Sequence, residues 1–403
     1  MASPQVAFVP KTRIARARSG EGALSGLTFA AKDLFAIRGH RSSAGHPDWA
    51  RTHEPAKRDA RVIATLLAAG ADLVGVTILD ELAYSLSGEN SFYGTPHNPR
   101  AEGRLCGGSS CGSAAAVAAC LCDFAVGTDT AGSVRVPAAY CGLFGLRPTH
   151  GTLSTEGVVP LAPSFDTVGL LARDPRTFER VASVLLGVAR VPSVERVLIA
   201  DDALALCDAG VAELLGDQVE RALKAVGAKV ERLQLAPEGF ATLREAHQRL
   251  QAREVWQAHG SWVREVQPRF SPAIQARFER ARALAEGDGT DLSCSADEIA
   301  EASAIRAGLR ARLGALLSPG TLLFLPPAPG IAPRVDASAR ELESHRTRLL
   351  ELTCLASLTG LPQLVVPARE LEGAPLALSF VAAAGSDAWL AQLATPLSTA
   401  PLS

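Results

Sequence analysis

Short apolar runs of strand length alternate with helix-length segments along most of this 403-residue chain. Strands bury short apolar runs rich in β-branched residues, whereas helices need longer stretches with a period near 3.6. The expected strands are Asp72–Thr77, Val197–Ala200, Val230–Leu235, Thr321–Leu325, Gln363–Val366 and Leu376–Val381, and the expected helices are Asp59–Ala69, Val211–Val226 and Ala296–Leu317. This alternation predicts an α/β fold in which a mixed central β-sheet is surrounded by α-helices.

The chain is long and apolar enough to bury one large core, since 47% of its residues are hydrophobic and 20% are charged. We find no internal repeat and no linker that would separate a second domain, so we expect residues 1–403 to form a single domain. Residues 1–22 are rich in arginine and predict a disordered or lightly docked arm, with a transit peptide as the alternative. Residues 240–317 predict a helical cap.

Two serines lie in glycine-rich turns, and one lysine precedes both. Gly107–Ser113 runs into an alanine-rich helix, and Gly127–Arg135 follows after the apolar stretch Ala114–Cys122. Further upstream, Lys32 ends the apolar run Leu27–Ala31, which is typical of a buried strand whose last residue enters a site. This arrangement of two serines and a lysine points to acyl transfer.

The chemistry explains why these residue types would be used together. A serine hydroxyl is a weak nucleophile, and lysine can activate it only where burial lowers the amine pKa. Ser109 can relay a proton between Lys32 and Ser133, because a hydroxyl donates and accepts at once. The glycines let backbone N–H groups approach a substrate carbonyl. The expected oxyanion-hole donors are the N–H groups of Thr130, Ala131, Gly132 and Ser133.

A second interpretation uses a different serine. Gly108–Gly112 also matches G-x-S-x-G, the nucleophile elbow of α/β-hydrolases, with Ser110 as nucleophile. That elbow needs a strand directly before it, whereas Thr95–Arg104 predicts a loop. Histidines that could serve this alternative are His150, His247, His259 and His345.

Several motifs resemble those of the amidase signature hydrolases, most strongly over residues 24–187. They are Lys32-Asp33, Gly75–Ala83, Gly88–Asn90, Tyr93–Pro99, Gly107–Ser110, Gly127–Arg135 and Asp166–Gly169. The resemblance implies an amidase signature fold in which Lys32 is the base, Ser109 follows a cis peptide bond and bridges, and Ser133 is the nucleophile. It implies supporting roles for Ser110, Asp129 and Arg135.

One departure from the family pattern lies beside the nucleophile, where Ala131 replaces the usual glycine and places a methyl group next to the expected oxyanion hole. We expect this methyl group to affect which substrate shapes the site accepts more than whether the enzyme is active. Gly45–Trp49, Gly88–Asn90 and Ser164–Gly169 resemble plant-type indole-3-acetamide amidases. The resemblance therefore implies hydrolysis of a small carboxylic amide, such as an arylacetamide, to acid and ammonia through an acyl-enzyme.

Two alternative hypotheses of function stay open. The chain could be a non-catalytic amidase-like binding domain, as in some preprotein receptors, or an amidotransferase subunit that passes ammonia to a partner protein. The presence of Lys32, Ser109 and Ser133 argues against the first. Asp80-Glu81 could form an acid–base pair, although we favour a structural role at the end of a strand. Arg135 could bind an anionic substrate, although buttressing the turn is the favoured interpretation.

Composition limits the partners. The formal net charge of −2 without a basic stripe argues against nucleic acid, and no apolar run reaches the length of about 18 residues that a membrane helix needs. Eight scattered cysteines predict reduced thiols and a cytoplasmic location. Cys120 and Cys122 have the wrong spacing for a zinc pair, so we expect no metal and no cofactor. Whether the chain forms a homodimer stays open.

Overall fold

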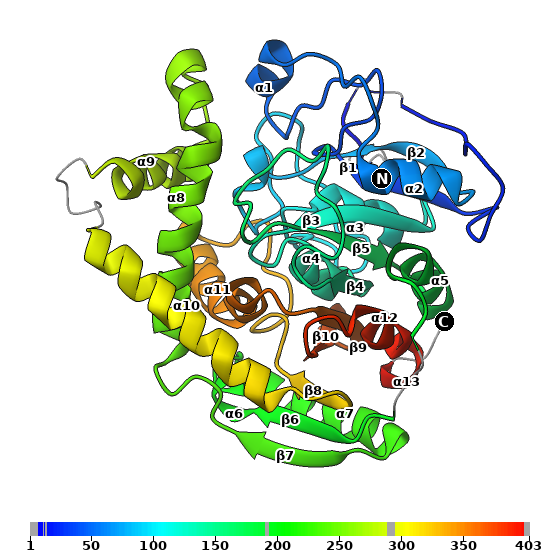
Figure 1. Ribbon diagram of the computed structural model, residues 1–403, viewed down its shortest axis with the longest axis vertical. Coiled ribbons are helices and arrows are strands. Elements are labelled where there is room, and N and C mark those ends of the chain that lie inside the picture. Colours follow the sequence, from blue (N-terminus) through cyan, green and yellow to red (C-terminus); the bar gives the residue numbers. More distant parts are fainter. Residues whose placement is uncertain (1–6, 11, 13, 190–192, 288–294, 399–403) are drawn as a thin grey trace.

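The computed structural model describes residues 7–10, 12, 14–189, 193–287 and 295–398. Within these residues, ten strands form one sheet in the order β2-β1-β3-β5-β4-β9-β10-β8-β6-β7 (Figure 1). The strands are β1 (Thr28–Lys32), β2 (Asp72–Thr77), β3 (Phe124–Asp129), β4 (Phe144–Arg147), β5 (Thr167–Ala172), β6 (Arg196–Ala200), β7 (Lys229–Leu233), β8 (Thr321–Phe324), β9 (Gln363–Leu371) and β10 (Ala374–Val381).

The sheet is mixed, with parallel pairs at both edges and antiparallel pairs in the centre. β1 runs parallel to β2 and β3, and β6 runs parallel to β7 and β8. Between them, β3, β5, β4, β9, β10 and β8 pair antiparallel in that order. The predicted mixed α/β fold is therefore confirmed, and β1 carries Lys32 at its carboxyl end between two neighbours.

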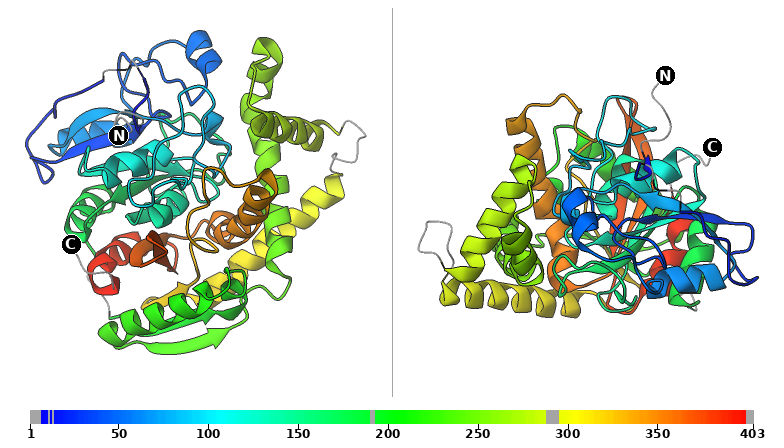
Figure 2. Two further views of the ribbon diagram at one scale, coloured as in Figure 1. Left: turned by 180° about the vertical axis from the view of Figure 1, so that it is seen from behind. Right: turned by 90° about the horizontal axis from the view of Figure 1, so that it is seen from above.

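Helices surround this sheet (Figures 1 and 2). They are α1 (Pro47–Thr52), α2 (Arg61–Ala68), α3 (Cys111–Ala118), α4 (Arg135–Tyr140), α5 (Pro175–Leu186), α6 (Asp201–Leu204), α7 (Val211–Val226), α8 (Phe240–Val266), α9 (Pro272–Glu286), α10 (Ala296–Leu316), α11 (Ala339–Thr359), α12 (Asp387–Gln392) and α13 (Ala394–Leu397). A short 3₁₀ turn spans Glu81–Ala83. The predicted bounds of β2 and α7 match the structure, whereas β7 lies one or two residues earlier than expected.

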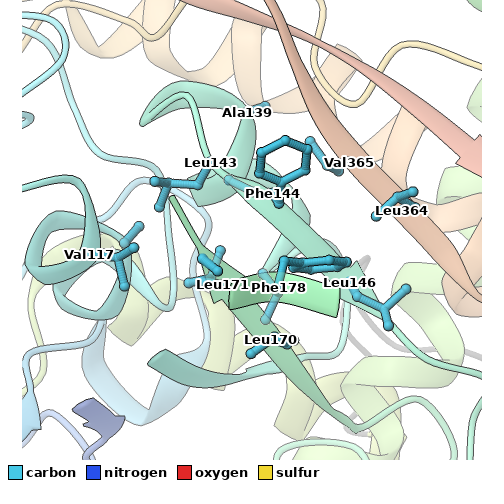
Figure 3. Close-up of a cluster of buried hydrophobic side chains, with 14 of the residues drawn as sticks. Val117, Ala139, Leu143, Phe144, Leu146, Leu170, Leu171, Phe178, Leu364 and Val365 are labelled. Carbon is cyan, nitrogen blue, oxygen red and sulfur yellow. The ribbon is translucent and has the colours of Figure 1, made fainter. Parts of the chain in front are cut away.

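The core around the centre of the sheet includes apolar side chains of β4, β5, β9, α3, α4 and α5 (Figure 3). Phe144 and Phe178 are almost fully buried, and their ring centroids lie 5.9 Å apart. Burying one such side chain stabilises the fold by about 1.5–3 kcal/mol. This packing fixes the antiparallel centre of the sheet, from which the loop after β3 projects.

The region predicted as a helical cap contains α8, α9 and α10, which lie together beside the sheet in all three views (Figures 1 and 2). α8 packs against α9, α10 and α11. A capping box, in which Ser295 and Glu298 exchange hydrogen bonds, starts α10. Residues 288–294 of this region lie outside the described residues.

The part of the predicted N-terminal arm that the structure describes lies along β2. The backbone N–H of Val9 donates to the Val76 carbonyl at 3.0 Å, and that of Arg16 donates to the Leu73 carbonyl at 2.8 Å. The Arg16 side chain also pairs with Asp59 at 2.9 Å. These contacts dock the described part of the arm against the outer edge of the sheet, and residues 1–6, 11 and 13 lie outside the described residues.

One hairpin extends further than the sequence predicts. β9 continues to Leu371 and β10 begins at Ala374, whereas the expected strands end at Val366 and begin at Leu376. Two turn residues with positive φ, Glu372 at 51° and Gly373 at 71°, join the strands. Such a two-residue turn matches the twist of the strands it connects, so the hairpin pairs up to the turn.

Candidate active site

The lysine predicted as the base lies in the interior. Lys32 ends β1, which lies between β2 and β3 in the sheet, and its side chain is fully buried. Its Nζ donates hydrogen bonds to Ser109 Oγ and to Thr128 Oγ1, each at 2.8 Å. The structure therefore brings together two of the three residues expected to carry the chemistry, and adds Thr128, to which the sequence analysis assigned no role.

The environment of Lys32 favours the neutral amine. Burial lowers the pKa of Lys32 to about 8, although the Asp80 carboxylate nearby favours the charged form. Roughly a tenth of the amines with such a pKa are neutral at pH 7. A neutral amine beside a serine hydroxyl can accept a proton, which a solvated lysine with its ordinary pKa of 10.5 cannot do efficiently at that pH.

The turn that carries Ser109 has no room for a larger residue before it. The Gly108–Ser109 peptide bond is cis. A Cβ on Gly108 would lie 2.4 Å from Asp80 Oδ1 and 2.6 Å from the backbone nitrogen of Gly88. Only glycine fits this close approach, which holds Ser109 beside Lys32.

The nucleophile candidate Ser133 lies in the loop between β3 and α4. Its carbonyl accepts a hydrogen bond of 3.2 Å from the backbone N–H of Ser110, which ties the two serine turns together. Ser133 lines a cavity of about 20 Å³, enough for one water-sized group. Among the described residues, no hydrogen bond joins the hydroxyls of Ser109 and Ser133; in apo sites such contacts commonly tighten only when substrate binds.

The loop Asp129–Arg135, which carries Ser133 and is called the nucleophile turn below, is held in place by one carboxylate. Asp129 accepts hydrogen bonds from the backbone N–H groups of Gly132, Val134 and Arg135 at 3.0, 3.1 and 3.3 Å. The N–H of Gly132 is therefore engaged with Asp129, which leaves those of Thr130, Ala131 and Ser133 as the expected oxyanion donors. Ala131 lines the small cavity beside Ser133.

The side chain of Thr130 is fixed as well, because its hydroxyl donates to Asp166 Oδ1 at 2.6 Å. Gly132 has a φ of 127°, and a Cβ there would approach Thr353 to 3.0 Å. Glycine is the residue that adopts such a φ without strain. The turn is thus rigid on both sides of Ala131.

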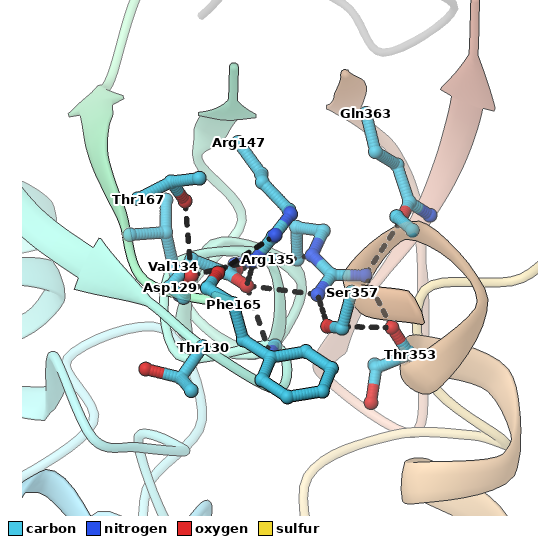
Figure 4. Close-up of polar contacts among 12 residues, drawn as sticks. Asp129, Thr130, Val134, Arg135, Arg147, Phe165, Thr167, Thr353, Ser357 and Gln363 are labelled. Carbon is cyan, nitrogen blue, oxygen red and sulfur yellow. Dashed lines mark hydrogen bonds and ion pairs between the residues drawn. The ribbon is translucent and has the colours of Figure 1, made fainter. Parts of the chain in front are cut away.

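Two arginines neutralise Asp129 in the interior (Figure 4). Arg135 Nη2 and Arg147 Nη1 lie 2.8 and 2.9 Å from Asp129 Oδ1, and all three side chains are fully buried. Although burial alone would raise the pKa of Asp129, the two guanidinium groups hold it well below its usual range. Arg135 also donates to the Thr353 carbonyl and to Gln363 Oε1.

This network joins the nucleophile turn to α11 and β9, more than 200 residues away along the chain. Arg135 lies beneath the turn and is fully buried, so its guanidinium makes internal contacts and does not border the Ser133 cavity. Sequence reasoning missed Arg147, because an arginine that ends a short strand carries no local signal of an internal ion pair.

Asp80 is a second buried carboxylate near the site. Its Oδ2 accepts the Gly88 N–H at 3.0 Å, whereas its Oδ1 is buried without a hydrogen-bond partner in the described part of the chain. Burial raises the pKa of Asp80. Its neighbour Glu81 accepts the backbone N–H of Ser271 at 3.1 Å, so the two carboxylates serve separate contacts.

The elbow interpretation finds no support in the geometry. Residues 95–109, all of them described, contain no strand, and Ser110 is fully buried with its hydroxyl directed at the Thr128 carbonyl. No described histidine bonds to Ser110. The four histidines contact Pro163, Phe165, Pro160 and Tyr140, in the order His150, His247, His259 and His345.

No group of three or more histidine, cysteine or acidic side chains that could hold a metal occurs among the described residues. Cys120 is exposed and Cys122 is buried. Within the same part of the chain, no helix is long and apolar enough to cross a membrane.

The fold and the site can now be compared with those of known enzymes. A solved structure described as "Crystal structure of amidase" superimposes with a TM-score of 0.81 and 30% identity, covering 94% of this chain and 85% of that one. The fold is therefore that of the amidases. The family model described as Amidase matches residues 9–390, and the chain belongs to this family. It is an amide-hydrolysing enzyme.

Two curated relatives show how the family varies. "Amidase 1" of Arabidopsis thaliana is 40% identical over 97% of each chain. "Translocon at the outer membrane of chloroplasts 64" of Pisum sativum is 35% identical over 91% of this chain and 65% of the relative. Similar sequences thus occur in proteins named for hydrolysis and in a protein named for translocation, so the catalytic residues must be tested directly.

Proposed function

We propose that the chain hydrolyses a small carboxylic amide to acid and ammonia through an acyl-enzyme on Ser133. Ser133 Oγ bonds to the amide carbon while its proton passes to Ser109 Oγ, whose own proton passes to Lys32 Nζ. The C–N bond then breaks, and the proton returns along the same path to the leaving nitrogen. Water attacks the ester in the same way and releases the acid. The observation that carries the proposal is the buried Lys32–Ser109 contact of 2.8 Å.

The oxyanion formed in each step would be held by backbone N–H groups of Thr130, Ala131 and Ser133. Asp129 and its two arginines hold the turn in one conformation before substrate binds, so little reorganisation accompanies the reaction. Removing one oxyanion donor in other enzymes costs about 10²–10³ in rate. The rigid turn is therefore as important to the proposal as the nucleophile.

For the acyl group, we propose small primary amides, with arylacetamides such as indole-3-acetamide as the first neutral members to test. The plant-type motifs around Trp49, Asn90 and Phe165 support this class, as does the similarity to a plant Amidase 1. A largely apolar cavity of about 430 Å³ that adjoins the Ser133 cavity is large enough for such a group.

The test uses a matched pair of serine variants. Ser133→Ala should abolish both ammonia release and labelling by a fluorophosphonate, as read by mass spectrometry of the intact protein. Ser110→Ala, which removes the neighbouring hydroxyl, should keep the label on Ser133. Labelling of Ser110, or full activity of Ser133→Ala, would refute the proposed nucleophile.

The same assay distinguishes an amidase from an amidotransferase subunit and from a non-catalytic binding domain. The purified chain alone should release ammonia and acid one to one. Activity that requires an added partner protein would favour an amidotransferase subunit, and a correctly folded chain that neither turns over amides nor takes the label would be a binding domain.

A further inference from the structure

Three neighbouring cavities share the side chain of Arg346, and Ser133 lines the smallest of them. The cavity of about 20 Å³ that contains Ser133 shares Ser85 and Leu86 with the cavity of about 430 Å³. It shares Tyr84 and Gln251 with a third cavity of about 290 Å³. Arg346 of α11 lines all three. Arg346 therefore borders both larger cavities next to the one that Ser133 lines, where an acyl group too large for about 20 Å³ would extend.

Arg346 has unused hydrogen-bonding capacity. Its Nε is buried without a hydrogen-bond partner among the described residues. Its Nη1 donates to Glu343, one turn earlier on α11, at 3.2 Å. The Glu343 side chain is 65% exposed, so solvent screens its attraction to Arg346. A second acceptor placed in the cavity would therefore find an available donor.

A second arginine lines the two larger cavities. Arg277 Nη1 donates to the Tyr84 carbonyl at 2.6 Å, and no carboxylate lies within 4.0 Å of this guanidinium in the described part of the chain. Burial, together with the nearby Arg346, lowers the pKa of Arg277 to about 10, so it is cationic at neutral pH. A cation in such a place is stabilised when an anion pairs with it.

The charges that face the large cavity come from four side chains. Arg277 and Arg346 are the cations, and Glu89 and Glu343 are the acids. Both acids are exposed, whereas the arginines are partly buried. The remaining wall is mainly apolar and includes Leu86, Leu105, Ile274, Leu342 and Leu349.

We infer that the preferred substrate is an amide whose acyl part carries a second, anionic end, a carboxylate that pairs with Arg346 and Arg277. This inference rests on the proposed function and specifies its substrate class. The apolar wall would hold the methylene or ring carbons between the two ends, and the planar guanidinium of Arg346 suits a carboxylate. A neutral amide of the same length would leave Arg277 without a carboxylate partner and Arg346 with only the exposed Glu343.

The test compares monoamides of dicarboxylic acids, from four to eight carbons, with neutral alkanamides of equal length. At the best length, kcat/KM for the acid-bearing amide should exceed that for its neutral match at least tenfold. In Arg346→Gln this acid-to-neutral ratio should fall at least tenfold, and Arg346→Lys should restore part of it. Glu343→Gln, which removes the competing acid, should raise the ratio.

Arg340→Gln is the matched control, because Arg340 is exposed on the same helix and lines none of these three cavities. In Arg340→Gln, the ratio of kcat/KM for the acid-bearing amide to kcat/KM for the neutral amide should equal that of the wild type. Preference for the neutral amide at every length, or an unchanged ratio in Arg346→Gln and Arg346→Lys, overturns the inference. If Ser133-dependent hydrolysis of neutral amides persists in that case, the proposed function stands and only the substrate class fails. Failure to hydrolyse either class overturns both.

Discussion

Replacing Lys32 by methionine should change how the stability of the protein depends on pH. In the folded protein burial lowers the pKa of Lys32 from 10.5 to about 8. Between these values the unfolded chain holds a proton that the folded chain lacks, so stability rises with pH. The destabilising effect of the buried lysine is full below pH 8 and disappears above pH 10.5.

The size of the effect follows from the shift. One pKa unit corresponds to about 1.4 kcal/mol, so the free energy of unfolding of the wild type, relative to Lys32→Met, should rise by about 2 kcal/mol from pH 7 to pH 9.5. Methionine also loses the hydrogen bonds to Ser109 and Thr128. The free energy lost with these hydrogen bonds is the same at each pH, so it does not contribute to the change in the wild-type-to-variant difference between pH 7 and pH 9.5.

Equilibrium urea denaturation of both proteins at pH 7, 8.25 and 9.5 measures this difference. The control is Lys57→Met, which replaces an exposed lysine and should follow the wild type across the range. In parallel, kcat/KM of the wild type should rise with pH to a plateau, with an apparent pKa of about 8, and Lys32→Met should lack activity. A wild-type-to-variant difference that stays constant within about 0.5 kcal/mol would refute the reasoning.

Three further predictions concern Thr128, Asp129 and the independence of turnover from metal. Thr128→Val should move the rise of kcat/KM to lower pH, because the variant loses one hydrogen bond that stabilises the ammonium form; an unchanged profile would remove Thr128 from this role. Asp129→Asn should lower the free energy of unfolding, measured in urea, by about 3–5 kcal/mol, because two buried arginines lose their carboxylate; a loss below 1 kcal/mol would contradict this. Treatment with EDTA should leave amide turnover unchanged, and activity restored only by zinc would sink the serine–lysine scheme.

The sequence predicts much of the secondary structure, because the spacing of apolar residues along a segment distinguishes a strand from a helix. The apolar alternation of Asp72–Thr77 and the helical period of Val211–Val226 gave the observed bounds of β2 and α7. Where a boundary was missed, as at the end of β9, the pairing of two strands extended each of them beyond its apolar run.

The sequence also determined which residue types could do chemistry. Glycines around Ser109 and Ser133 are needed wherever the backbone must approach closely, and the structure shows such approaches at Gly108 and Gly132. A lysine at the end of an apolar strand could be expected to be buried, and Lys32 is. These inferences need only the covalent properties of a few neighbouring residues.

Tertiary structure alone decided the partners of these residues. Nothing near Arg147 in the sequence announces that it shares Asp129 with Arg135, and the contact of Arg135 with Gln363 spans 228 positions. Likewise, Arg346 lines the Ser133 cavity because α11 packs against α8 and α10, which are distant from it in the sequence. The sequence determines which side chains carry charge. Their solvation and their neighbours depend on packing between distant segments, and these set the pKa values of the buried groups.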